Sequence, residues 1–355
     1  MRKTFDSAFT SVFNSASSRR RQLTLAMALA AAGFGLSAQA ADAVNLKFSS
    51  FEPPMANITA NVLTPFAKEA SAASQGTLQI TMFAGGTLGR NPTQQLKLVT
   101  DGVADIAWIV LPYTPGRFDD TDVVSLPFLI RNATEASVSL HRLYNAKELA
   151  GFDGLKMLAL ASTPPLGIHG KKAVRKPDDF KGMRVRGTGD IVMKIIESLG
   201  GAPVQLAGGQ VAESMARGVV DLTLNNWGFV GDFKVNEVTS EHFAVPLGAT
   251  AVGVVMRQDR FDALPKEAQQ AIEKASGEML ARRIGEAFDR QEVEVSERVG
   301  KSGRNNVVKA NDAQLAEWKQ VIDPVSDNWR KGNARNESIY QKYNAELQRV
   351  RAGAK

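Results

Sequence analysis

Two polar side chains, Arg186 and Asn225, follow apolar runs of the kind that form buried strands, and together they have the chemistry to bind an anion. Arg186 ends the run of residues 183–186, and Asn225 follows the run of residues 219–224. A guanidinium can hold a carboxylate through two parallel charge-assisted hydrogen bonds, and an amide can add another. The alternatives are a structural salt bridge for Arg186 and a turn cap for Asn225. We predict recognition of a carboxylate, with Arg186 as the main anchor.

The segments around these residues alternate in an order that places both at one edge of a sheet. Strands are expected at residues 183–186, 202–206 and 219–224, and helices at residues 191–199 and 211–217. This order is typical of a mostly parallel sheet with crossover helices, which binds ligands at the carboxyl ends of its strands. Arg186 and Asn225 stand at two such ends. Thr188 and the backbone N–H groups after Arg186 could complete the carboxylate site.

Composition favours a globular protein and excludes several kinds of site. The 355-residue chain is 44% hydrophobic and 23% charged, which suits one large or two ordinary domains. It has no cysteine, so disulfides, thiolate metal sites and cysteine nucleophiles are excluded. Beyond residue 40 the chain carries 38 basic and 36 acidic residues, which leaves it nearly neutral. No basic stripe with interleaved aromatic residues occurs, so nucleic-acid binding is not expected.

The first 40 residues are predicted to be a cleaved signal peptide. Arg19-Arg20-Arg21 precedes an apolar stretch at residues 23–36, and Ala38-Gln39-Ala40 fits the small-x-small cleavage rule. The arginines resemble a twin-arginine signal, and the ordinary secretory route is the alternative. An uncleaved anchor helix is disfavoured because the apolar stretch is short and contains glycine. We therefore expect an exported protein.

An earlier part of the chain repeats the strand–helix pattern. Strands are expected at residues 44–49 and 78–83, a turn into a buried strand at residues 102–110, and helices at residues 57–74 and 93–100. Both halves contain a helix, then Gly-Val-(Ala/Val)-Asp, then an apolar strand. Two similar α/β units in an exported chain indicate two lobes that face a cleft.

Several motifs resemble the DctP-type substrate-binding proteins of TRAP (tripartite ATP-independent periplasmic) transporters. The most specific are Lys-Gly-Met-Arg-Val-Arg, which ends at Arg186, the Gly-Gly-Ala-Pro-Val turn, and Gly-Val-Val-Asp-Leu-Thr-Leu-Asn-Asn, which contains Asn225. Residues 76–105 and 124–129 resemble the first lobe of the family, and residues 113–118 resemble a subset of it. The resemblance therefore covers both halves of the chain.

The resemblance implies an α/β, two-lobed periplasmic-binding-protein fold with mixed sheets, a hinge and a long helix spanning both lobes. It also implies that Arg186 holds the carboxylate of a small organic acid and that Asn225 adds a hydrogen bond. The protein would be a periplasmic monomer that closes on its ligand and delivers it to the membrane subunits of a TRAP transporter. Closure would be favoured because contacts from lobe I exist only in the closed state.

The remaining candidates for ligand contact lie beside strand ends or in turns: Trp108, Ile109, Trp227, His169, Phe51 and Glu52. The first three would form an apolar wall, and core packing is the alternative for the tryptophans. The histidine could donate a hydrogen bond, although a lone histidine usually has a structural role. The phenylalanine and the glutamate, in the first turn of lobe I, could close the pocket.

The ligand is expected to be a smaller or more apolar monoacid, with an aromatic acid as one candidate. Relatives that bind acidic sugars carry a glutamate at the position of Val110 and a second arginine near Leu166-Gly167, and this chain has neither. The resemblance therefore disfavours an acidic sugar and a double-arginine grip.

The predicted domain order follows from the same pattern. It consists of the signal peptide (residues 1–40), lobe I (41–165), lobe II (166–249), a return to lobe I with the long spanning helix (250–290), and C-terminal helices packing on lobe II (291–355). The spanning helix is expected to run without a break from Pro265 toward Gly300. Trp318 and Trp329 are expected to pack on lobe II.

Catalysis, metal binding and cofactor binding are not expected. The three histidines form no metal-binding pair, and neither a Gly-x-Ser-x-Gly motif, a calcium-loop spacing nor a phosphate-binding glycine spacing occurs. Two alternatives to transport remain open at this point. One is a ligand-sensing protein that signals to a membrane receptor kinase, and the other is an exported enzyme acting on an organic acid.

Overall fold

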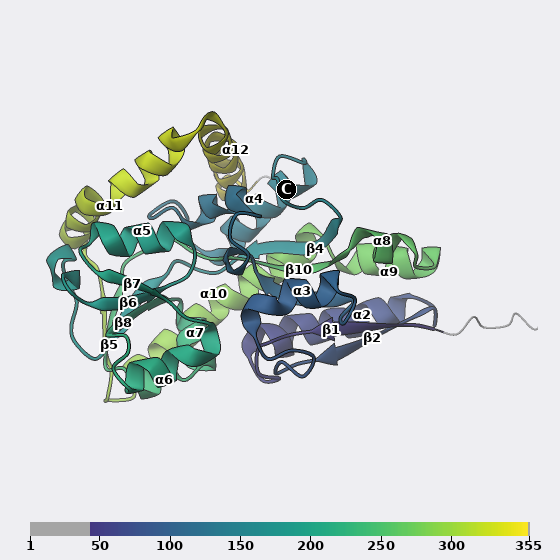
Figure 1. Ribbon diagram of the computed structural model, residues 1–355, viewed down its shortest axis with the longest axis horizontal. Helices are drawn as coiled ribbons and strands as arrows, with labels where there is room; N and C mark the ends of the chain where they lie inside the picture. Colours follow the sequence, from purple (N-terminus) through teal and green to yellow (C-terminus); the bar gives the residue numbers. More distant parts are fainter. Residues whose placement is uncertain (1–42, 354–355) are drawn as a thin grey trace, which may run out of the picture. The chain divides into compact units, whose positions relative to one another are not determined.

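Two mixed β-sheets organise residues 43–353, the part of the chain that the structure, a computed structural model, describes (Figure 1). The strands of the first sheet are β1 (Val44–Ser49), β2 (Leu78–Phe83), β3 (Ile106–Val110), β4 (Leu155–Ser162) and β10 (Ala251–Arg257). Their order is β2-β1-β3-β10-β4. β1 pairs in parallel with β2 and β3, whereas β10 runs antiparallel to β3 and β4. We call the half of the structure built on this sheet lobe I.

The second sheet forms lobe II. Its strands are β5 (Gly167–Gly170), β6 (Arg184–Gly187), β7 (Ala202–Gln205), β8 (Leu222–Asn225), β9 (Glu241–Ala244) and β11 (Asn306–Lys309). Their order is β11-β9-β5-β8-β6-β7, with β6 parallel to β7 and β8. These mixed sheets confirm the predicted two-lobed α/β fold. The predicted signal peptide lies outside the described residues.

Helices cover both sheets. Those that follow lobe I strands are η1 (Thr59–Leu63), α2 (Thr64–Ala73), η2 (Pro92–Gln94), α3 (Gln95–Thr100), η3 (Leu111–Tyr113), η4 (Asp119–Ser125), α4 (Ala133–Asn145), α8 (Gln258–Asp262) and α9 (Lys266–Ala275). Those that follow lobe II strands are η5 (Pro177–Phe180), α5 (Asp190–Ser198), η6 (Gly208–Gln210), α6 (Val211–Ala216), α7 (Trp227–Asp232) and η7 (Val235–Glu237). Three longer helices complete the described chain: α10 (Glu278–Gly300), α11 (Asp312–Gly332) and α12 (Ala334–Arg351).

The strand–helix order predicted around Arg186 is confirmed as β6-α5-β7-α6-β8. Helix α5 buries Ile191 and Ile195 against the sheet, as its apolar spacing predicts. Gly187 lets this helix approach β6, because a Cβ there would lie 2.8 Å from a side-chain carbon of Ile196. The close packing fixes the turn after β6, where Arg186 and Thr188 are held.

Two chain segments cross between the lobes and hydrogen-bond to each other. The Thr163 N–H donates to Thr250 O at 3.0 Å, and the Leu166 N–H donates to Gly248 O at 2.7 Å. Gly248 has φ +88°, and a Cβ at that position would lie 2.1 Å from Ser125 O. Only glycine therefore fits this crossing without moving the backbone.

The predicted spanning helix is two helices, which corrects the expectation of a continuous helix from Pro265. α9 ends at Ala275, and α10 begins after Gly277, which has a φ of +75°. The Gly277 N–H donates to Leu158 O of β4 at 2.7 Å, so the break is tied to lobe I. Even without α9, α10 contacts both lobes: it packs on α4 and β4 in lobe I and on α7 in lobe II (Figure 1). Its 23 residues span about 35 Å, which suffices to brace both lobes.

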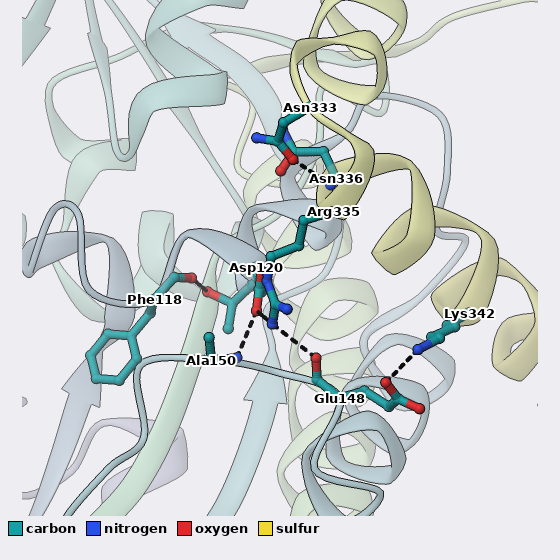
Figure 2. A network of polar contacts seen from close by, with 9 residues as sticks. Phe118, Asp120, Glu148, Ala150, Asn333, Arg335, Asn336 and Lys342 are labelled. Atoms are coloured by element: carbon teal, nitrogen blue, oxygen red, sulfur yellow. Dashed lines mark hydrogen bonds and ion pairs between the residues drawn. The ribbon is translucent and has the colours of Figure 1, made fainter.

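The two C-terminal helices pack on different lobes, whereas both were expected on lobe II. α11 packs on α5, and the buried Trp318 meets Phe180 edge to face with ring centroids 5.7 Å apart. α12 packs instead on α4 of lobe I. Figure 2 shows the polar contacts at this junction, where Arg335 pairs with Asp120 of η4. The turn between α11 and α12 therefore carries the chain from one lobe to the other.

Candidate ligand-binding site

A cavity lies between the lobes at the carboxyl ends of the parallel strands. Its volume is about 70 Å³, several times the roughly 10–15 Å³ that one water needs on the same measure, so it has room for a small molecule. Phe51 and Glu52 line it just after β1, and Thr188 lines it just after β6. Arg186 and Asn225 line it from β6 and β8. The edge of the sheets predicted to bind ligand is thus the edge that forms the cavity.

Arg186 is the buried cation of this cavity, with an exposed fraction of 2%. Its Nε and Nη2 donate to Leu206 O at 3.2 and 3.0 Å, and its Nη1 donates to Asn225 Oδ1 at 2.9 Å. Nη2 also donates to the Tyr113 hydroxyl of lobe I at 3.4 Å. Burial lowers the pKa of the guanidinium, yet it stays charged because its ordinary pKa is far above neutrality. Among the described residues its hydrogen-bond partners are all neutral, so the positive charge is not balanced by a carboxylate.

Asn225 and Thr188 line the same cavity as this guanidinium. Asn225 is 4% exposed, and its Nδ2 donates to Thr223 Oγ1 at 2.5 Å, which orients the amide oxygen toward Arg186. Thr188 is 4% exposed and lines the cavity. The three predicted polar residues at the strand ends therefore come together in the folded chain.

The lobe I side of the cavity is built by Trp108, Phe51 and Glu52. The Trp108 indole Nε1 donates to Glu52 Oε1 at 2.9 Å, and the Thr59 hydroxyl donates to Glu52 Oε2 at 3.0 Å. Trp108 and Val110 face the cavity from alternate positions of β3. Trp108 therefore serves both as a wall and as a clamp on the Glu52 carboxyl.

Ile109 and Trp227 do not line the cavity, which corrects two of the predicted contacts. Ile109 lies between Trp108 and Val110 on β3, so the pleat turns it to the opposite face of the sheet, where it is 2% exposed. Trp227 packs in the core of lobe II, and its backbone N–H donates to Glu292 Oε2 at 2.9 Å. Both side chains are structural because β-strand alternation and the start of α7 point them away from the ligand space.

His169 is also behind the cavity and not in it. Its Nε2 lies 3.0 Å from Asn225 O and its Nδ1 lies 2.8 Å from His242 Nδ1. A carbonyl oxygen only accepts hydrogen bonds, so Nε2 carries the proton and donates to Asn225. Burial lowers the pKa of His169 to about 3, so the ring is neutral. His169 thus supports the strand end that presents Asn225, and it does not itself face the ligand space.

Several lining residues were missed by the sequence analysis. Tyr113 enters from η3, and Phe229, Asp232 and Phe233 enter from α7 and the position after it. The Phe229 ring lies 5.3 Å from the Arg186 guanidinium carbon, in cation–π range. The signal was a Phe-x-x-x-Phe spacing four residues apart after Asn225, which puts both rings on one face of a short helix.

Two carboxyl groups in the cavity have raised pKa values. Burial, and then the neighbouring Asp232, raise the pKa of Glu52 to about 7 against the hydrogen bond from Trp108. Burial raises the pKa of Asp232 against the hydrogen bonds from Gln291 and the Asn57 N–H. The cavity therefore combines a cation at the strand ends of lobe II with two acids that resist ionisation.

Two kinds of feature are absent from residues 43–353. The side chains of these residues include no group of three or more histidines and acids placed to hold a metal ion. Over the same range, every helix is too short or too polar to cross a membrane.

Residues 48–332 match the sequence model of the family described as bacterial extracellular solute-binding protein, family 7, also called DctP. The chain belongs to this family. Membership confirms the predicted resemblance and makes the protein a solute-binding protein. The family and its structural neighbours are receptors for solutes, not enzymes.

Solved structures of TRAP solute-binding proteins share the fold along nearly their whole length. A marine metagenome TRAP solute-binding protein, specific for aromatic acid ligands and crystallised with 3-hydroxybenzoate, is 28% identical, with a TM-score of 0.82 over 87% of this chain and 99% of that one. A TRAP protein from Bordetella bronchiseptica with bound (R)- and (S)-mandelate is 25% identical, with a TM-score of 0.77 over 86% and 99% of the two chains.

Characterised relatives in sequence include TsaT of Comamonas testosteroni, described as an outer membrane transporter protein. It is 28% identical over 325 residues, which cover 88% of this chain and 92% of TsaT. The C4-dicarboxylate-binding periplasmic protein DctP of Rhodobacter capsulatus is 24% identical over 74% of this chain and 79% of that one.

Proposed function

We propose that this protein captures a small aromatic or otherwise apolar monocarboxylate in the periplasm and delivers it to the membrane subunits of a TRAP transporter. The observation that carries the proposal is Arg186, a buried guanidinium with neutral partners in a cavity walled by Trp108, Phe229 and Phe288. A buried charge is costly unless an opposite charge offsets it. The carboxylate of the ligand supplies that charge.

The walls of the cavity indicate that the rest of the ligand is apolar or aromatic. Phe51, Phe229, Phe233 and Phe288 present rings to the cavity together with the indole of Trp108. A flat aromatic ligand buries apolar surface in such a site and packs against these rings. The two relatives described above, with 3-hydroxybenzoate and mandelate, bind acids of this class. Arg186 as the single guanidinium lining the described cavity fits one carboxylate better than two.

Closure of the lobes supports capture in place of surface binding. Tyr113 of lobe I reaches Arg186 of lobe II, and the Asn57 N–H donates to Asp232 Oδ2 at 3.3 Å. A ligand between these groups touches both lobes, so it stabilises the closed arrangement through contacts that an open arrangement lacks. The closed surface is what we expect the TRAP membrane subunits to bind.

The proposal is tested by a thermal-shift and calorimetric screen of the mature protein against aromatic, aliphatic, keto and dicarboxylic acids. A ligand at 100 times its Kd should add about 2.7 kcal/mol to the free energy of unfolding. We expect aromatic monocarboxylates to bind and Arg186→Ala to weaken them about thirtyfold or more, because truncating a buried charge partner costs about 2–5 kcal/mol.

The matched control is Arg184→Ala. Arg184 lies two residues earlier on β6 but pairs with Asp221 at the surface, so its loss should leave the affinity unchanged. Equal affinity of Arg186→Ala and the wild type would show that Arg186 is structural and would remove the basis of the proposal.

A further inference from the structure

We propose that Glu52 and Asp232 select acids that carry a hydroxyl group on the side of the molecule away from the carboxylate. The inference rests on the proposed function, since it takes Arg186 as the anchor for the carboxylate. It adds a second polar contact, made by two residues that a simple carboxylate-plus-apolar site does not use.

The first step is geometric. Glu52 enters the cavity from lobe I, directly after β1, and Asp232 enters from lobe II, at the end of α7. Both line the same cavity as Arg186, and Asp232 is near enough to contribute to the raised pKa of Glu52. A ligand held by Arg186 therefore has an acidic group from each lobe within the same space.

The second step is the rigidity of these carboxyl groups. Glu52 receives hydrogen bonds from Trp108 Nε1 and the Thr59 hydroxyl, one on each oxygen. Asp232 Oδ1 accepts a hydrogen bond from Gln291 Nε2 at 3.0 Å, and Asp232 Oδ2 accepts one from the Asn57 N–H. The groups are held before any ligand arrives, so little ordering is needed on binding.

The third step counts the hydrogen bonds that each carboxyl group can still accept. A carboxylate has about four acceptor positions. The Trp108 indole and the hydroxyl and backbone N–H of Thr59 use three of them on Glu52. Gln291 and the Asn57 N–H use two on Asp232. Acceptor positions therefore remain on Glu52 and Asp232, both of which line the cavity. An unsubstituted ring placed against them would remove water without replacing its hydrogen bonds, which is unfavourable.

The fourth step chooses between a hydroxyl and an ammonium group as the ligand's second polar group. Burial raises the pKa of both acids, and that of Glu52 reaches about 7, so Glu52 occupies both protonation states near neutrality. A hydroxyl both donates and accepts, so it fits either state, whereas an ammonium group fits only a carboxylate. The same burial makes a second full charge on the ligand expensive. Both considerations favour the hydroxyl.

The test compares matched pairs of ligands by isothermal titration calorimetry. The pairs are benzoate with 3- and 4-hydroxybenzoate, and phenylacetate with 3- and 4-hydroxyphenylacetate, in which the hydroxyl lies away from the carboxylate. At least one hydroxylated acid should bind the wild type about tenfold or more tightly than its parent, since a hydrogen bond to a charged group contributes at least that factor. Glu52→Gln and Asp232→Leu should each reduce this preference by about threefold or more.

The parent acid provides a readout that a merely structural role would not produce. Its affinity is the reference in Glu52→Gln and Asp232→Leu, because loss of the hydroxyl contact lowers the ratio of the two affinities even where the change also alters binding of the parent acid. A general loss of structure would instead weaken both members of every pair. Asp221→Asn makes the same acid-to-amide change as Glu52→Gln at a strand start outside the cavity, so it should leave all the ratios unchanged.

Three results would overturn the inference. The first is a wild type that binds no hydroxylated acid more tightly than its parent, and the second is a preference that survives in both variants. The third is tighter binding of 3-(aminomethyl)benzoate than of every hydroxybenzoate. None of these depends on the effect of Arg186→Ala, so the failure of this inference is distinguishable from the failure of the proposed function.

Discussion

Arg186 and Arg335 are the same residue type in two opposite electrostatic settings. Arg335 donates to both oxygens of Asp120 and to the backbone oxygen of Glu148, and its side chain is 52% exposed (Figure 2). Arg186 is 2% exposed as a residue and donates only to neutral oxygens of the described chain. The paired arginine joins α12 to lobe I. The buried arginine without a carboxylate partner retains the capacity to bind an anion, and this difference distinguishes the candidate site from the structural junction.

Removal of Asp120 should give the largest effect on stability and none on affinity. The Asp120 side chain is 6% exposed, and its Oδ2 also accepts the Ala150 N–H at 2.6 Å. Asp120→Ala leaves that donor and Arg335 without their acceptor, so we expect a loss of about 1–3 kcal/mol in the free energy of unfolding. Urea unfolding and ligand titration measure the two quantities separately.

The control for Asp120→Ala is a surface pair. Lys97 and Asp101 form an i,i+4 ion pair in which both side chains are largely exposed. Asp101→Ala should change the free energy of unfolding by less than about 1 kcal/mol. A weaker ligand affinity in Asp120→Ala would show that the junction and the binding site are coupled, and the contrast drawn above would not hold.

Arg186→Lys sharpens the comparison because it keeps the charge and removes the planar fork. Lysine has one ammonium head in place of two parallel N–H groups, so it cannot reach Leu206 O and a ligand carboxylate in the same way. We expect an affinity loss of about tenfold, smaller than for Arg186→Ala. Arg335→Lys at the junction should leave the affinity unchanged. Equal affinities of Arg186→Lys and the wild type would mean that charge alone, without bidentate geometry, binds the ligand.

The pH dependence of stability should reveal Glu52, the lobe I acid that lines the same cavity as Arg186. The pKa of Glu52 rises from 4.5 in the unfolded chain to about 7 in the folded protein, so folding binds a proton at this site. This contribution to stability is fully present below pH 4.5 and is lost as the pH rises through about 7. After allowance for solvent screening of the half-buried residue, we expect a loss of about 1–2 kcal/mol between pH 5 and pH 8.

The measurement is the difference between the wild type and Glu52→Gln in urea unfolding across that pH range. Other buried groups also titrate, such as Glu292, whose pKa burial raises to about 8, and their effects cancel in the difference. A difference that stays constant from pH 5 to pH 8 would mean that Glu52 is ionised throughout, in spite of its burial.

The sequence by itself determined the strand–helix order and the placement of Arg186 and Asn225 at neighbouring strand ends. Apolar periodicity is a local property, so β6, α5, β7, α6 and β8 appear within a few residues of their predicted ends. The position of Arg186 and Asn225 at strand ends then follows from the geometry of parallel sheets. Thr188, Trp108, Phe51 and Glu52 also reach the cavity because each lies beside such a strand end or at the end itself.

Only the tertiary structure decided which neighbouring side chains face the ligand space. Ile109 and Trp227 are apolar residues near strand ends, but the strand pleat and the start of α7 turn them into the core. Tyr113 and Asp232 reach the site from opposite lobes. Each forms a hydrogen bond with a residue of the other lobe that is distant in the chain, Tyr113 with Arg186 and Asp232 with Asn57. The break at Gly277 and the packing of α12 on lobe I likewise depend on partners distant in sequence, at Leu158 and Asp120. Local patterns carry no information about such pairings because the pairings are fixed only when the two lobes pack together.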